Sequence, residues 1–155
     1  MKEKQYLLSK AIFLATTFHN NQFDKAGVPY ILHCIKVMHY LKSDDEELNC
    51  IAILHDIIED TKCSDIELYE AGMTDRIVNG IKALTKLKGM TIEQYLTQIK
   101  ANKDAIKVKM CDLRHNSDIR RLKDVKQKDF DRIVKYHKMF QELNKLKETK
   151  NEQIS

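Results

Sequence analysis

The stretch that decides the fold is Ile53-Leu54-His55-Asp56-Ile57-Ile58-Glu59-Asp60, where a histidine and an aspartate interrupt an apolar run that ends at Ile58 and is followed by two acidic residues. Leu48, Ile51, His55 and Ile58 recur at the spacing of one helix face, so we predict a helix whose core-facing seam contains His55. Burying an imidazole and a carboxylate together costs free energy unless a partner compensates them. A divalent cation is such a partner, and we therefore expect a metal site here.

Two further candidate ligands lie in apolar settings, His33 before this stretch and Asp112 after it. A lone inward-facing histidine is most often a satisfied core residue, and a lone buried aspartate usually has an internal salt bridge. Two histidines and two aspartates, contributed by three predicted helices, nevertheless favour one shared divalent ion. Imidazole combined with carboxylate suits Mn²⁺, Fe²⁺, Zn²⁺ or Co²⁺ better than Ca²⁺.

Two acidic residues, Glu59 and Asp60, lie one helical turn beyond His55 and Asp56. A metal with four protein ligands keeps positions for a water and a substrate oxygen, where it acidifies the water and polarises a phosphoryl group. Glu59 or Asp60 is then placed to take or relay a proton. The residues alone therefore predict a metal-dependent hydrolase.

The composition predicts one all-α domain. The chain has 155 residues, enough for one core and too few for two, and only one Pro and four Gly. An all-β fold needs many more turn residues, and no segment alternates as a strand. We predict a helical bundle of about seven or more helices over residues 1–146, followed by a polar, disordered tail over residues 147–155.

Capping boxes and turn residues set the predicted boundaries. Boxes at Ser43, Ser64 and Thr91 each start a helix, and Gly27 with Pro29 marks the clearest loop, at residues 24–29. The helices are predicted at residues 4–21, 31–41, 43–58, 64–72, 74–84, 91–102, 104–116 and 128–146.

Charge and cysteine usage limit the function classes. The formal net charge is +4 and is not gathered into one tract, which suits a small anionic substrate or weak attraction to polyanions. The absence of a basic patch with interleaved aromatics argues against a nucleic-acid binder. Four cysteines without C-x-x-C spacing predict free thiols in a reducing compartment. Without a signal peptide or membrane-spanning stretch, we expect a cytoplasmic protein with no membrane partner.

Three ordered motifs give the chain a family resemblance: FHNNQFDKAGVPYILH at residues 18–33, AILHDIIEDT at residues 52–61 and KMCDLRHN at residues 109–116. With them the sequence resembles the HD-domain metal-dependent phosphohydrolases. Within these it is similar to the hydrolase domain of the RelA/SpoT homologues in its short form, the small alarmone hydrolases. The resemblance runs from about Leu7 to Leu122.

The resemblance implies a fold, a cofactor and a reaction. The fold is the HD-domain helical bundle, and one ion, usually Mn²⁺, is bound by His33, His55, Asp56 and Asp112. Glu59 and Asp60 are implied to be the catalytic acidic pair. Metal-bound hydroxide would attack the 3′-pyrophosphate of a small nucleotide, ppGpp or pppGpp, releasing pyrophosphate and GDP or GTP.

The implied nucleotide contacts are Lys25, Asn116, Arg120 and Arg121. One position departs from the family, since ppGpp-specific members commonly carry a basic pair where this chain has Asp24-Lys25. An aspartate cannot stack on guanine as the missing arginine does, and we expect it to repel phosphate.

Three other interpretations stay open. The first is an HD hydrolase acting on another phosphorylated nucleotide or phosphoester. The second is a non-catalytic helical module that binds a ligand, and the third is a nucleic-acid binder. The last helix packs either on its own core or on a second copy, which would make a homo-oligomer.

Overall fold

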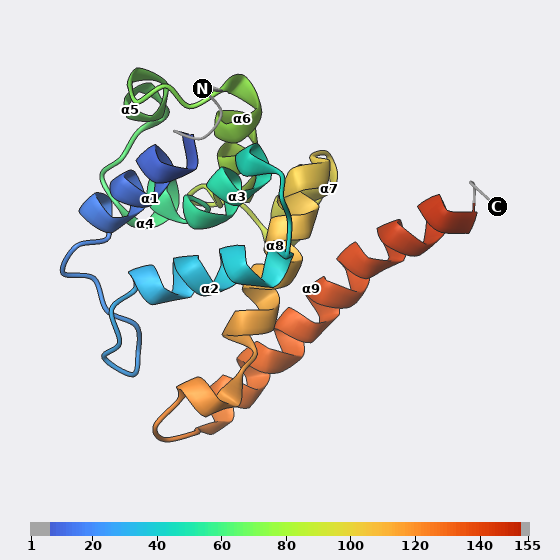
Figure 1. Ribbon diagram of the computed structural model, residues 1–155. Coiled ribbons are helices and arrows are strands. Elements are labelled where there is room, and N and C mark those ends of the chain that lie inside the picture. Colours follow the sequence, from blue (N-terminus) through green and yellow to red (C-terminus); the bar gives the residue numbers. More distant parts are fainter. Residues whose placement is uncertain (1–6, 153–155) are drawn as a thin grey trace.

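The computed structural model describes the backbone of residues 7–152 and the side chains of residues 7–146. This part of the chain is all-α, as predicted, with one isolated antiparallel bridge between Phe23 and Pro29 and no strand (Figure 1). Its helices are α1 (Leu7–Phe18), α2 (Ile31–Leu41), α3 (Glu46–Ile53), α4 (Ile57–Asp60), α5 (Asp65–Glu70), α6 (Asp75–Leu84), α7 (Ile92–Lys100), α8 (Lys103–Asn116), the 3₁₀ turn η2 (Ile119–Arg121) and α9 (Gln127–Glu152).

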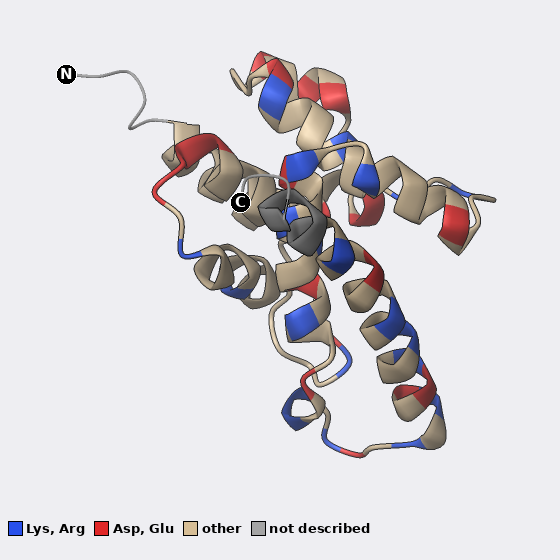
Figure 2. Ribbon diagram, turned by 90° about the vertical axis from the view of Figure 1, so that its right-hand side faces the viewer, with Lys and Arg blue, Asp and Glu red and all other residues tan. Residues whose placement is uncertain are grey.

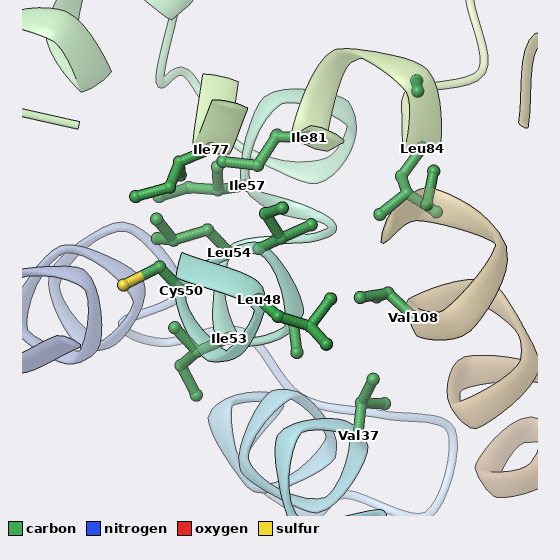
Figure 3. Packing of buried hydrophobic residues seen from close by; sticks show 14 of the residues in the cluster. Val37, Leu48, Cys50, Ile53, Leu54, Ile57, Ile77, Ile81, Leu84 and Val108 are labelled. Carbon is green, nitrogen blue, oxygen red and sulfur yellow. The ribbon is translucent and has the colours of Figure 1, made fainter. Parts of the chain in front are cut away.

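Helix α3 lies at the centre of the bundle. It packs against α1, α2, α6 and α8, and α8 in turn packs against α2, α6, α7 and α9. Figure 3 shows Ile77 and Ile81 of α6 lying against Leu54 and Ile57, which follow α3, and all four side chains are fully buried. Each such side chain contributes about 1.5–3 kcal/mol of transfer free energy. This burial holds the segment around His55 in the core.

The predicted continuous helix over residues 43–58 is wrong, because the chain breaks between α3 and α4. Leu54 and Asp56 both leave the helical region, with φ −101°, ψ 4° and φ −103°, ψ 1° respectively. These angles lie in the sparsely populated bridge region, which is common at functional sites. Neighbouring residues on a regular helix point about 100° apart. The break frees His55 and Asp56 from that constraint, and Leu54 and Ile57 stay buried on either side.

Two of the three predicted capping boxes are confirmed, at Ser64 and Thr91. The box at Ser43 is wrong, because Asp45 caps α3 by accepting the backbone N–H of Leu48. Arg76 of α6 donates to the same carboxylate at 2.6 Å, which favours Asp45 as the cap. The cap of α3 therefore lies at Asp45 and not at Ser43, and the capping carboxylate also forms an ion pair with α6.

The last helix packs on the domain's own core. Met139 and Leu143 are buried, and α9 lies against α8. Its backbone continues to Glu152, past the predicted end at Leu146, and extends beyond the other helices (Figure 1). Residues 153–155 of the predicted tail lie outside the described part.

Two further predictions, on the cysteines and on membrane-spanning segments, can be compared with the structure. The four cysteines are free thiols, and three of them, Cys34, Cys50 and Cys63, are buried. Between residues 7 and 152, the structure contains no helix with both the length and the apolarity needed to cross a membrane.

The crossing of α3 and α6 depends on Gly80. A Cβ atom at this position would lie 2.6 Å from Ile51 Cδ1, inside the fully buried core. We expect Gly80→Val to lower the free energy of unfolding by about 1–3 kcal/mol through overpacking, measured by urea denaturation. Asn79→Val, on an exposed position of the same helix, is the control and should cost less than about 0.5 kcal/mol. Equal effects of the two variants would contradict this account of the crossing.

Candidate metal centre

Four side chains from three segments meet at one point in the core. His33 comes from α2, His55 and Asp56 from the break between α3 and α4, and Asp112 from α8. One ligand atom from each lies within 4.8 Å of all the others. His33, His55 and Asp112 are at most 3% exposed. The four residues that the sequence singled out are thus brought together, and they form the one His, Cys, Asp and Glu group of the described residues that could hold a metal ion.

The proton of the His55 imidazole points away from this centre. His55 Nδ1 lies 2.8 Å from the carbonyl oxygen of Ala52, and a carbonyl only accepts, so this nitrogen carries the proton. His55 Nε2, 3.3 Å from His33 Nε2, therefore turns a lone pair inward. A histidine whose outer nitrogen donates to the protein while the inner one faces the site is typical of metal ligands.

The four inward atoms are two imidazole nitrogens and two carboxylate oxygens. His55 Nε2 is 2.9 Å from Asp56 Oδ2, and His33 Nε2 is 3.1 Å from Asp112 Oδ1. Acceptors packed this closely inside a protein require a positive charge between them. The donor set of two nitrogens and two oxygens fits a divalent transition metal.

The electrostatics of the site show the same demand for positive charge. Burial opposes protonation of His55, but Asp56 and Asp112 outweigh it and raise the pKa of the imidazole well above its ordinary value. Burial would raise the pKa of Asp56, yet the neighbouring His55 lowers it to about 2. In this geometry a proton on His55 and a cation at the centre compete for the same carboxylates.

Neighbouring polar groups hold both carboxylates in place. The Tyr30 hydroxyl donates to Asp56 Oδ2 at 2.6 Å, and Lys109 Nζ lies 2.7 Å from Asp112 Oδ2. Sequence reasoning assigned no role to either residue. The position of Lys109 three residues before Asp112, on one helix face, is the signal that could have found it. Asn116, predicted as a nucleotide contact, donates to Asp112 Oδ1 at 2.7 Å.

The acidic pair Glu59 and Asp60 lies in α4, next to the centre and open to solvent. Glu59 accepts the backbone N–H of Lys86, in the loop after α6. Partial burial, together with the charge of Asp56, raises the pKa of both carboxyl groups. Both carboxyl groups therefore keep a proton up to a higher pH than ordinary surface carboxylates do.

His19 supports this pair from the end of α1. Its ring is 2% exposed, its Nδ1 bonds the Gln22 side-chain oxygen, and Gln22 Nε2 donates to the backbone oxygen of Asp60. His19 Nε2 is the one buried side-chain nitrogen or oxygen of the described residues without a hydrogen-bond partner.

A cavity of about 260 Å³ opens beside the metal centre, with Tyr30 in its wall. Three of the predicted nucleotide contacts line it, namely Lys25, Asn116 and Arg121. The fourth, Arg120, does not line it, and its 87% exposed side chain pairs with Asp118.

The C-terminal helix adds a further wall to this cavity. Arg132 and Tyr136 of α9 line it, and sequence reasoning did not find them. No motif connects α9 to the other walls, and only the tertiary packing brings it there.

Comparison with known proteins supports the same fold. The family model described as HD domain matches residues 11–152. The guanosine-3′,5′-bis(diphosphate) 3′-pyrophosphohydrolase of Haemophilus influenzae is 34% identical over 115 residues, which cover 66% of this chain and 17% of that protein. The bifunctional (p)ppGpp synthase/hydrolase SpoT of Escherichia coli K12 is 36% identical over 86 residues, covering 52% of this chain and 12% of that protein.

Among solved structures, a metazoan ortholog of SpoT, described as hydrolysing ppGpp and playing a role in starvation responses, has the same fold. The TM-score is 0.74 at 20% sequence identity, and the match covers 92% of this chain and 86% of that one. Because the family model matches nearly the whole chain and the His-Asp pair lies at the centre of the cluster, this chain belongs to the HD-domain family.

Proposed function

We propose that this protein is a metal-dependent phosphohydrolase that removes the 3′-pyrophosphate of ppGpp or pppGpp, giving GDP or GTP and pyrophosphate. The observation that carries the proposal is the convergence of two histidines and two aspartates next to a cavity lined by Lys25 and Arg121. The names of the Haemophilus influenzae and Escherichia coli relatives support the substrate. The chain spans less than a fifth of either relative, at 17% and 12% of their lengths.

The residues divide into metal ligands, a proton-transfer pair and substrate contacts. His33, His55, Asp56 and Asp112 would hold one divalent ion, which we propose to be Mn²⁺. When bound, such an ion acidifies a water and polarises a phosphoryl oxygen. Glu59 and Asp60 take up and release the proton of the attacking water and the leaving group.

Substrate binding in this proposal depends on the walls of the cavity. Lys25 and Arg121 contact phosphate oxygens, because an ammonium and a guanidinium pair well with such a highly charged ligand. Tyr30 and Lys109 keep the ligand carboxylates in one orientation through their hydrogen bonds to Asp56 and Asp112. We also propose that the protein works in the cytoplasm, since its four free thiols suit a reducing compartment.

A second candidate is an HD hydrolase for another phosphorylated nucleotide, favoured by Asp24 in the wall of the cavity. A nucleic-acid ligand has less support. Figure 2 shows Lys and Arg positions interleaved with Asp and Glu positions along the helices.

The substrate assignment is tested by incubating the Mn²⁺-loaded protein with ppGpp. We expect GDP and pyrophosphate in equal amounts, resolved by anion-exchange chromatography. GDP as the starting substrate is the control, since it carries no 3′-phosphate and should stay intact. Absence of product from ppGpp, together with turnover of another nucleotide in a substrate panel, would instead establish the second candidate.

Metal binding should raise the thermal stability of the protein. After treatment with a chelator and dialysis, adding Mn²⁺ at about 100 times its Kd should stabilise the fold by about 2.7 kcal/mol, read from thermal melts. His55→Ala should abolish this gain because it removes one of the four ligands. His39→Ala, an exposed histidine on α2, is the control and should keep it. An unchanged melting temperature in the wild type would contradict the metal site.

The acidic pair is tested by Glu59→Gln and Asp60→Asn, each expected to lower kcat by about 10²–10⁴-fold. The Mn²⁺-induced gain in melting temperature should remain. Because both carboxyls have raised pKa values and must be ionised to accept a proton, wild-type kcat should fall with decreasing pH above the range where ordinary carboxylates titrate. Glu70→Gln, an exposed carboxylate on α5, is the control. Full activity in both site variants would exclude their proposed role.

A further inference from the structure

Asp24 is held inside the turn that follows α1, not directed freely at the cavity. Its Oδ1 accepts the backbone N–H groups of Ala26 at 2.9 Å and Val28 at 3.0 Å. The turn closes further through Asp24 N–H to the Val28 oxygen at 2.8 Å, and Gly27 supplies the positive φ of 80° that it needs. The carboxylate therefore organises this loop from within.

The other oxygen of Asp24 pairs with Arg121, 97 positions further along the chain. Arg121 Nη2 lies 3.3 Å from Asp24 Oδ2, and both side chains are mostly buried, at 22% and 16% exposed. Burial opposes the ionised form, yet the two backbone N–H groups and Arg121 together lower the pKa of Asp24. Its negative charge is thus matched by donors on both oxygens.

Arg121 continues the connection toward the metal centre. Its Nη1 donates to the His115 carbonyl and to Asn116 Oδ1, both at 3.1 Å. Asn116 in turn donates to Asp112 Oδ1 at 2.7 Å. A continuous line of hydrogen bonds therefore runs from the loop at Asp24 to a metal-ligand carboxylate.

The ion pair also joins two walls of the cavity. Asp24 and Lys25 come from the loop after α1, whereas Asn116 and Arg121 come from the end of α8 and from η2. Of the three cations in the wall, Arg121 is paired with Asp24 and Arg132 with Asp129, and no ion pair is formed by Lys25 within residues 7–146. Lys25 is therefore the wall cation whose full charge is available to a phosphate.

We propose that the Asp24–Arg121 ion pair is a latch that holds the two walls of the cavity together and fixes the position of Arg121 toward a phosphorylated nucleotide. The proposal rests on the proposed function. In it Asp24 is a positioning residue, which acts through Arg121 and the loop without contacting substrate. It reverses the expectation from sequence that Asp24 weakens binding by repelling phosphate.

The variant Asp24→Asn distinguishes the latch from simple repulsion of phosphate by Asp24. An asparagine keeps a side-chain oxygen for Ala26 and Val28 but loses the charge that pairs with Arg121. We expect KM for ppGpp to rise roughly tenfold, the value of one charge-assisted hydrogen bond, with kcat changed less than about twofold. A lower or unchanged KM would overturn the latch in favour of simple repulsion.

Asp118→Asn is the matched control. Asp118 lines the same cavity, but it pairs with the exposed Arg120, within its own segment. The variant removes the same charge without cutting the link between the walls. We expect it to leave KM unchanged or to lower it up to about twofold. Equal rises in KM for the two variants would overturn the latch.

Arg121→Gln tests the pair from the other side. If the two residues act as one unit, the double variant should have a KM within about twofold of the higher single variant. Additive effects would show two independent contributions and contradict the latch. Thermal melts confirm that each variant is folded before its kinetics are compared.

A readout without substrate keeps the latch distinct from the proposed function. In Arg121→Gln, hydrogen exchange of the Ala26 and Val28 amides should be faster by roughly threefold or more, because the loop loses its anchor. Faster exchange without ppGpp hydrolysis by the wild type would support the latch and contradict the proposed function. Unchanged exchange would overturn the latch even in an active enzyme.

Discussion

Two imidazole nitrogens and two carboxylate oxygens, all acceptors, lie within 4.8 Å of one another in the core of this protein. The surrounding structure stabilises this unfavourable arrangement of acceptors. These candidate ligands come from α2, from the break between α3 and α4, and from α8, so the three segments must pack together before the site exists. Helix α3 packs against both α2 and α8 and so holds together the segments that carry the four side chains.

Hydrogen bonds from surrounding groups restrict the orientation of each of the four side chains. Carbonyl, imidazole, hydroxyl, ammonium and amide groups hold the outer side of the site, supplied by Ala52, His115, Tyr30, Lys109 and Asn116 respectively. Although burial disfavours its charge, Asp112 raises the pKa of Lys109, so this cation stays protonated beside the cluster. Polar groups in a low-dielectric interior are stable only when satisfied in this way, and such networks specify one geometry.

The cavity next to this centre is built from segments that are distant in sequence. The loop after α1, the end of α8 with η2, and α9 each supply part of its wall. The charges there are largely paired with one another, as Asp24 with Arg121 and Arg132 with Asp129. A site for a polyanion can therefore contain carboxylates without repelling its ligand, provided that each carboxylate has its own donors.

The sequence by itself determined the helical class, most helix boundaries and which four residues are the candidate metal ligands. These depend on local signals, namely apolar periodicity, capping residues and buried polar side chains that need a common partner. Where a side chain is itself the signal, as with His33 or Asp112, no tertiary information is required to suspect it.

Tertiary structure alone decided the break at Leu54–Asp56, the cap at Asp45 and the partner of Asp24. The break leaves Leu54 and Ile57 buried in the core, and Arg76 of the distant helix α6 engages the carboxylate that caps α3. From the sequence, Asp24 was expected to repel phosphate, because no neighbouring residue shows what pairs with its charge. The guanidinium that pairs with it lies 97 positions away in the chain. Long-range ion pairs and packing leave no periodic trace in the chain, and only the folded structure reveals them.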